Sequence, residues 1–196
     1  LKKKPAVALW LIERGVVLTN EFVLQNIRLP LITAVAVMIP DKKVLQALLD
    51  KGLDINVSVN GLSILHLLVT IPQIPGHLDV MQFIIDKGFP INGNNESFTP
   101  LHMATQQNKV ESVKLLIDAG ADKNRLVTLP GNPLDKLTPL AIAAFHYHTV
   151  LIELLIDKKA DASVQMKFGE NALYYLSFAN NGSPDLNLVK LLVDAG

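Results

Sequence analysis

The feature that most constrains this chain is a short segment that occurs, with changes, five times along it. The segment "TPLHMA" begins at residue 99, and similar segments begin at residues 29, 63, 138 and 171. Successive starts are therefore separated by 34, 36, 39 and 33 residues. A second apolar segment follows each start, as in "VKLLIDAG" and "LIELLIDKK". Units this short cannot each bury a core of their own, so we expect the chain to stack them into a solenoid.

The best-formed unit carries clear signals for where its two helices begin and end. The side chain of Thr99 can accept a hydrogen bond from a free amide at the start of the first helix, and Pro100 suits the first helical position. The second helix is expected to end at Gly120, because glycine favours the left-handed conformation of a helix stop. Its apolar residues follow the three-four spacing of a helix that packs one face on a neighbour: Val110, Val113, Leu116 and Ile117.

The other units keep the start signal with individual changes. Thr138 and Pro139 repeat it in full. Ser63 and Asn171 keep the capping residue without the proline. Pro30 keeps the proline without the capping residue, so we expect a weaker helix start there.

The stop signal and a leucine in the first helix recur at fixed positions of the repeat. Glycine occupies the stop position at Gly15, Gly52, Gly88, Gly120 and Gly196. Lys159 replaces it in one unit, where either the lysine accepts left-handed geometry at a cost or the turn differs. A shared position in the first helices predicts the core row between units: Leu31, Leu65, Leu101, Leu140 and Leu173.

On these residues, above all "TPLHMA…VKLLIDAGADKN", the chain resembles the ankyrin-repeat family over nearly all of its length. The resemblance implies an all-α fold, a solenoid of helix-turn-helix units joined by β-hairpin-like loops. We expect a single domain over residues 1–196, with a half repeat at 5–28 and repeats at about 29–62, 63–98, 99–137, 138–170 and 171–196. The terminal units are not obviously polar on their outer faces, so we also expect this chain to be a fragment of a longer one.

Composition and charge exclude several classes of function. The 18 basic and 18 acidic side chains balance, which leaves no net field to attract a nucleic-acid backbone, and we predict no nucleic-acid partner. The longest apolar run, residues 29–40, is too short for a bilayer, so we predict no membrane insertion. The chain has no cysteine, which excludes disulfides and thiolate catalysis. We expect a cytoplasmic protein, or alternatively one that a bacterium secretes into the host cytoplasm.

The chain carries no motif that would make it an enzyme. It has neither a glycine-rich phosphate loop nor a nucleophile elbow, and we predict no catalytic residue, cofactor or metal. His66, His102 and His77 match structural histidines of the family. His146 and His148 are two residues apart at a helix end, where we expect the rings to point in different directions.

The resemblance also implies where a partner would bind. Ankyrin-repeat proteins bind other proteins through hairpin tips and the exposed side of the first helices, which form a concave surface. By position, that surface would contain Glu96, Phe98, Gln106, Gln107, Leu129, Asp135, Leu137, Phe145, His146, Phe168 and Phe178. Aromatic side chains are favoured anchors of interfaces, although several of these could instead tuck into the solenoid.

A lengthened hairpin at 125–137 leaves two interpretations open. "LPGNP" is a strong turn signal flanked by leucines. The segment is either a loop whose leucines fold back on the hairpin or a finger that presents them to a partner.

These observations predict a protein–protein interaction module with a protein partner that the sequence does not identify. Other domains of the same chain are expected. One alternative is the non-catalytic targeting arm of a larger multidomain protein or enzyme, including a bacterial effector that acts in a eukaryotic host cell. Another is a structural spacer with no partner on the concave surface.

Overall fold

The structure is a computed structural model of the 196-residue chain. It describes residues 4–14, 21–24, 27–71, 74–93, 98–127, 136–179, 182–183 and 185–196. The chain forms two compact units, Leu1–Pro90 and Ile91–Gly196. Both units consist mainly of helices joined by short hairpins, so the predicted all-α fold class is confirmed. The predicted domain and repeat boundaries stay predictions.

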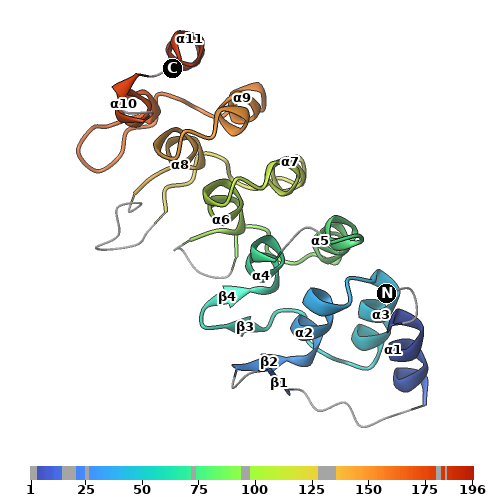
Figure 1. Cartoon of the computed structure of the whole chain (residues 1–196). Coiled ribbons are helices and arrows are strands. Elements are labelled where there is room, and N and C mark those ends of the chain that lie inside the picture. Colours follow the sequence, from blue (N-terminus) through green and yellow to red (C-terminus); the bar gives the residue numbers. More distant parts are fainter. Residues whose placement is uncertain are drawn as a thin grey trace. The chain divides into compact units, whose positions relative to one another are not determined.

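The first unit contains two layers of helices and two small hairpins (Figure 1). In one layer α1 (Lys4–Glu13) packs beside α3 (Lys42–Asp50), which packs beside α5 (His77–Asp86). In the other layer α2 (Leu31–Met38) packs beside α4 (Ile64–Thr70). Each repeat therefore contributes its first helix to one layer and its second helix to the other.

Two antiparallel hairpins lead into the first helices of this unit. Strands β1 (Glu21–Leu24) and β2 (Ile27–Pro30) pair with Glu21 opposite Pro30. Strands β3 (Ser58–Val59) and β4 (Leu62–Ser63) pair with Ser58 opposite Ser63. Each hairpin ends where a first helix begins, which fixes the direction in which that helix starts.

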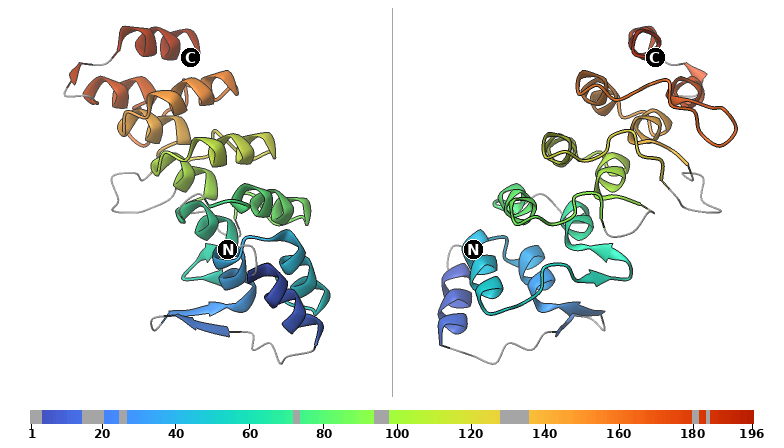
Figure 2. Two further views of the ribbon diagram at one scale, coloured as in Figure 1. Left: turned by 45° about the vertical axis from the view of Figure 1, so that its right-hand side comes forward. Right: turned by 180° about the vertical axis from the view of Figure 1, so that it is seen from behind.

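The second unit has the same two layers, formed by three pairs of helices (Figure 2). Its first helices α6 (Pro100–Gln106), α8 (Pro139–Phe145) and α10 (Ala172–Phe178) pack in succession. Its second helices α7 (Val110–Asp118), α9 (Thr149–Asp157) and α11 (Leu186–Asp194) form the other layer. We call these the first-helix layer and the second-helix layer.

The leucines of the predicted core row differ in how deeply they are buried. Leu65, Leu101 and Leu140 are fully buried or nearly so. Leu31 and Leu173, in the first and last full repeats, are half-buried. Within each compact unit these leucines lie on first helices that pack side by side, and their burial is complete only in the middle repeats.

The predicted helix starts are present in the second unit. Thr99 Oγ1 accepts a hydrogen bond from the His102 amide, and Thr138 Oγ1 accepts one from the Ala141 amide at 3.1 Å. Asn171 performs the same role for α10. Pro30 makes no such side-chain hydrogen bond at the start of α2, in agreement with the weaker start predicted there.

The predicted left-handed helix stops are present at three of the glycines and at the position without glycine, whereas Gly196 does not have a positive φ. Gly52, Gly88 and Gly120 have φ values of 84°, 81° and 94°. Lys159 has φ 62°, so it adopts the left-handed conformation instead of changing the turn. Its amide donates to the Ile156 carbonyl at 2.8 Å, as the Gly120 amide donates to that of Ile117 at 2.9 Å. Gly15 lies outside the described residues.

Candidate protein-binding surface

The structure divides the eleven residues predicted to bind a partner into distinct groups. Glu96, Leu129 and Asp135 lie outside the described residues. The other eight belong to the second unit. Six of them are exposed or half-exposed on the first helices or on the hairpin before α10: Gln106, Gln107, Phe145, His146, Phe168 and Phe178. The remaining two, Phe98 and Leu137, pack inward.

Leu137 is fully buried and therefore does not belong to a binding surface. Its carbonyl accepts a hydrogen bond from the Val127 amide at 2.9 Å, and this backbone pairing turns its side chain into the core below the hairpin. That core cluster consists of Val127, Leu137, Ala141, Ile142 and Met166. For Leu137, the interpretation in which the leucines fold back on the hairpin is the correct one.

Phe98 is half-buried and packs against the same core cluster. Its ring centroid lies 5.7 Å from that of His102. Phe98 therefore packs between the core cluster and the first turn of α6. The sequence left open whether some of the aromatic residues tuck into the solenoid, and this one does.

Four aromatic side chains, three of them exposed, form a continuous row across α8 and α10, which we call the aromatic strip: Phe145, Tyr174, Tyr175 and Phe178. The Phe145 and Tyr175 rings are 6.1 Å apart at an interplanar angle of 70°. Tyr174 lies 5.4 Å from Tyr175 and 4.9 Å from Phe178. Two of these contacts are edge-on, an arrangement that aromatic rings prefer, and the third is tilted.

The strip is open to water although its rings are large. Phe178 is 68% exposed, Tyr174 47% and Phe145 42%. Tyr175 is half-buried and packs against the core cluster, so it anchors the strip to the interior. The sequence reasoning missed both tyrosines. The spacing of four residues between Tyr174 and Phe178 on one helix was the signal that could have placed them together.

Two histidine rings extend the row from Phe145. The His146 ring lies 5.0 Å from Phe145 in an edge-on contact and 5.5 Å from His148, nearly parallel at 18°. The expectation that the two histidines point in different directions is therefore wrong. Tyr147 between them has φ 55°, so the chain leaves the helix there and helical spacing no longer applies. Partial burial, and secondarily His148, lower the pKa of His146.

The histidine pair is tied to the fold through His148. His148 Nε2 donates to the Gln106 carbonyl at 3.2 Å, which connects the start of α9 to the end of α6. Within the described ranges, no group of three or more histidine, aspartate or glutamate side chains is placed to hold a metal ion.

Phe168 stands at the tip of the hairpin that precedes α10 and is 80% exposed. A backbone hydrogen bond from Met166 to Glu170 of 2.8 Å closes the hairpin. The Phe168 amide donates to Glu170 Oε2 at 2.9 Å, and Lys167 Nζ lies 5.2 Å from the centroid of its ring. Both charged side chains of the hairpin therefore interact within it, while the phenylalanine ring stays exposed.

The remaining predicted histidines are structural, as the family resemblance implied. His102 is fully buried; its Nδ1 accepts from the Thr99 amide at 3.3 Å and its Nε2 donates to the Arg125 carbonyl at 2.9 Å. Burial lowers the pKa of His102 to about 4. His66 accepts from the Ser63 amide in the same way. His77 is buried with its Nε2 against the Leu68 carbonyl.

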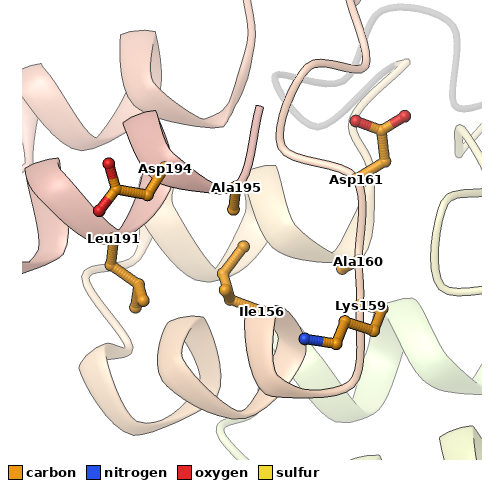
Figure 3. A pocket seen from close by; sticks show the side chains of 7 residues that line it. All are labelled: Ile156, Lys159, Ala160, Asp161, Leu191, Asp194 and Ala195. Carbon is orange, nitrogen blue, oxygen red and sulfur yellow. The ribbon is translucent and has the colours of Figure 1, made fainter.

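A groove that the sequence did not predict lies in the second-helix layer, between α9 and α11 (Figure 3). Its volume is about 440 Å³, and Ile156 and Leu191 form its apolar part. The other residues that line it are Lys159, Ala160, Asp161, Asp194 and Ala195. Its lining combines charged and small residues, unlike the continuous rings of the aromatic strip.

Comparison with known proteins identifies the repeat. A family model for ankyrin repeats in three copies matches residues 31–127. The ankyrin repeat and SAM domain-containing protein 6 of Rattus norvegicus is 29% identical over 99 residues, which cover half of this chain and a tenth of that protein. The family match ends before α8, so the assignment of the aromatic strip to two further repeats depends on the structure. No helix in the described part of the chain is long and apolar enough to span a bilayer.

Proposed function

Because this chain is an ankyrin-repeat protein, we propose that it binds another protein through the aromatic strip of its second unit. Ankyrin repeats generally mediate protein–protein interactions, and they are typically non-catalytic modules. We propose that the partner binds the first-helix layer at the aromatic strip and that the chain has no catalytic role. A cytoplasmic location stays a prediction.

The observation that carries the proposal is the contiguity of the exposed rings. Single exposed apolar residues are common on protein surfaces and need no explanation. Phe145, Tyr174 and Phe178 are each at least two-fifths exposed and are joined by ring contacts, with Tyr175 between them. A continuous apolar patch of this kind is typical of an interaction site, and tyrosine is enriched among the residues that dominate binding energy.

The packing below the strip supports the proposal because it limits the entropy lost on binding. Tyr175 is held by the core cluster, and Phe145 ends a helix that begins at the Thr138 cap. Rings that are already ordered lose less conformational freedom when a partner covers them. Of the strip, Tyr175 is held by core packing before a partner binds.

Affinity capture with the full chain and two matched variants tests this function. The double variant Phe145→Ala/Phe178→Ala removes the two ends of the strip. The control Leu186→Ala removes a large side chain that is 73% exposed on α11, outside the strip. We expect a set of captured proteins, quantified by mass spectrometry, to be lost with the double variant and retained with the control. Equal capture by wild type and both variants would contradict the proposal.

A second candidate function follows from the architecture of the relative. Its name specifies a second kind of domain beside the ankyrin repeats, and the matched stretch is a tenth of its length. We infer that the present repeats act as the non-catalytic targeting arm of a larger protein. Immunoblotting of the natural product with an antibody against residues 136–179 tests this, and a band near the 21.4 kDa of this chain would contradict it.

A further inference from the structure

We propose that the aromatic strip binds an uncharged, apolar peptide segment, a specificity that rests on the function proposed above. The segment would place one or two large apolar side chains against Phe145 and Phe178. It would carry no lysine, arginine, aspartate or glutamate between those anchors. The distribution of charge in the second unit, the state of the charges beside the strip and the polar atoms within it support this choice of occupant.

Charge is absent from the whole first-helix layer of this unit. None of the chain's 36 lysine, arginine, aspartate and glutamate side chains lies in α6, α8 or α10, whose sequences are "PLHMATQ", "PLAIAAF" and "ALYYLSF". The second helices, in contrast, read "VESVKLLID", "TVLIELLID" and "LNLVKLLVD", each with at least two charges. A partner that lies along the first helices therefore meets no fixed charge on them.

The two charges on the hairpin beside the strip already have partners. Glu170 accepts the Phe168 amide, and Lys167 lies over the Phe168 ring. Burial first, and then Glu170 and Tyr174, raise the pKa of Tyr175. The two charges are opposite in sign, so the hairpin supplies no net field that would favour an acidic or a basic segment.

A charged side chain placed over the rings would lose hydration without meeting an opposite charge on α8 or α10. That loss is costly when no opposite charge or dense set of hydrogen bonds replaces the water. A cation could still interact with a ring face, but that attraction is modest at an exposed site. An apolar side chain makes no hydrogen bonds to water that it would lose, and it gains from the removal of its surface from water against the rings. The balance therefore favours an apolar anchor over both acidic and basic ones.

The polar atoms of the strip suit the backbone of a peptide. Tyr174 and Tyr175 each bring a hydroxyl group, which can both donate and accept a hydrogen bond. Amide and carbonyl groups recur along any peptide and are uncharged, so they can pair with these hydroxyls without an ionic contribution. An apolar surface with interspersed hydroxyls is thus better suited to bind a neutral peptide than to bind a partner surface made only of hydrocarbon.

Selection from a phage-displayed library of random dodecapeptides on the full chain tests the proposal. We expect enriched clones to share large apolar residues and to lack charged residues between them. Synthetic peptides from these clones should lose at least about tenfold in affinity for Phe145→Ala/Phe178→Ala and keep their affinity for Leu186→Ala. Between about 0.05 M and about 0.5 M NaCl their affinity should change less than about twofold, because no ion pair is screened.

The outcomes separate this inference from the function on which it rests. Clones that depend on Phe145 and Phe178 but carry conserved lysine, arginine, aspartate or glutamate overturn the uncharged specificity and leave the binding function standing. Clones whose affinity is unaffected by the double variant overturn both, and so does a library that yields no clone above background.

Discussion

The two helix layers of the second unit differ in where their polar groups are. The first helices contain no charged side chain, and two of them begin at buried threonines, Thr99 and Thr138, that cap the helix. The helices α7 and α9 begin without such a side-chain hydrogen bond and carry charges that face water. The described ion pair between them, from Lys158 Nζ to Asp118 Oδ1 at 2.5 Å, is exposed and contributes little to stability.

This difference separates the residues that stabilise the fold from those available to a partner. In the first-helix layer, buried caps and the leucine row hold each helix, so its outward residues are not needed for folding. In the second-helix layer, the outward residues interact with water. We therefore expect substitutions of the exposed rings Phe145, Tyr174 and Phe178 to leave the fold intact, whereas substitutions of the buried residues that support them should not.

The largest expected effect is at the buried side of α8. Leu140→Ala removes a side chain that is 1% exposed in the core row, and we expect the free energy of unfolding to fall by about 3 kcal/mol. Phe178→Ala, on the exposed side of the same layer, should lower it by about 0.5 kcal/mol or less. Urea unfolding followed by circular dichroism measures both. If the two variants lost equal stability, the strip would be part of the core and the comparison would fail.

The next effect tests the buried polar caps through pH. His102 has a pKa of about 4 in the folded chain and 6.5 as the ordinary value, because burial disfavours its charged form. Above pH 6.5 the group is neutral in both states and has no effect. As the pH falls from 6.5 to 4, the unfolded chain binds the proton first, so the folded state loses about 3 kcal/mol of stability.

The variant His102→Gln isolates this contribution. The glutamine does not titrate, and its carbonyl can still accept the Thr99 amide. We expect the stability of the variant, relative to its own value at neutral pH, to fall less steeply than that of wild type between pH 6.5 and pH 4. Equal slopes for the two proteins would show that His102 is not the group responsible.

The sequence predicted the repeated parts of this molecule well because each depends on local chemistry. Thr138 before a proline specifies a helix start, and the stop position is left-handed even where Lys159 replaces glycine. Leu137 was assigned wrongly because the side of a hairpin to which a residue points depends on the pairing of Val127 with it. Tyr174 was missed because its exposure depends on what packs beside α10.

The histidine pair shows the limit of helical rules in particular. His146 and His148 were expected to diverge, as residues two apart on a helix do. The left-handed Tyr147 breaks that geometry and brings the rings together. A positive φ at tyrosine has no reliable signal in a single sequence, because most residues other than glycine avoid it.

A smaller effect compares helix starts in the two layers. Thr138→Ala would leave the buried Ala141 amide without its partner, and we expect a loss of about 1.5 kcal/mol. Asp185→Ala removes the cap that accepts the Asn187 amide at 2.7 Å in α11, where water can replace it, so we expect about 0.5 kcal/mol. Thr138→Ser is the control that keeps the hydroxyl. Equal losses in urea unfolding would mean that burial does not distinguish the caps.

The smallest effect concerns the helix stops of the second-helix layer, where one position occurs with and without glycine. An added Cβ at Gly120 would meet no atom within 4 Å, so Gly120→Ala tests backbone conformation alone, and we expect a loss of about 1 kcal/mol. Lys159 has the same left-handed conformation with a side chain. Lys159→Gly should therefore raise the free energy of unfolding by about 0.5 kcal/mol, since relief of strain exceeds the added entropy of the unfolded chain. Differential scanning calorimetry of both variants measures the opposite signs. A loss at Lys159→Gly would mean that the lysine side chain stabilises the end of α9 through its contacts at the groove, and that the stop is not merely a glycine position occupied by another residue.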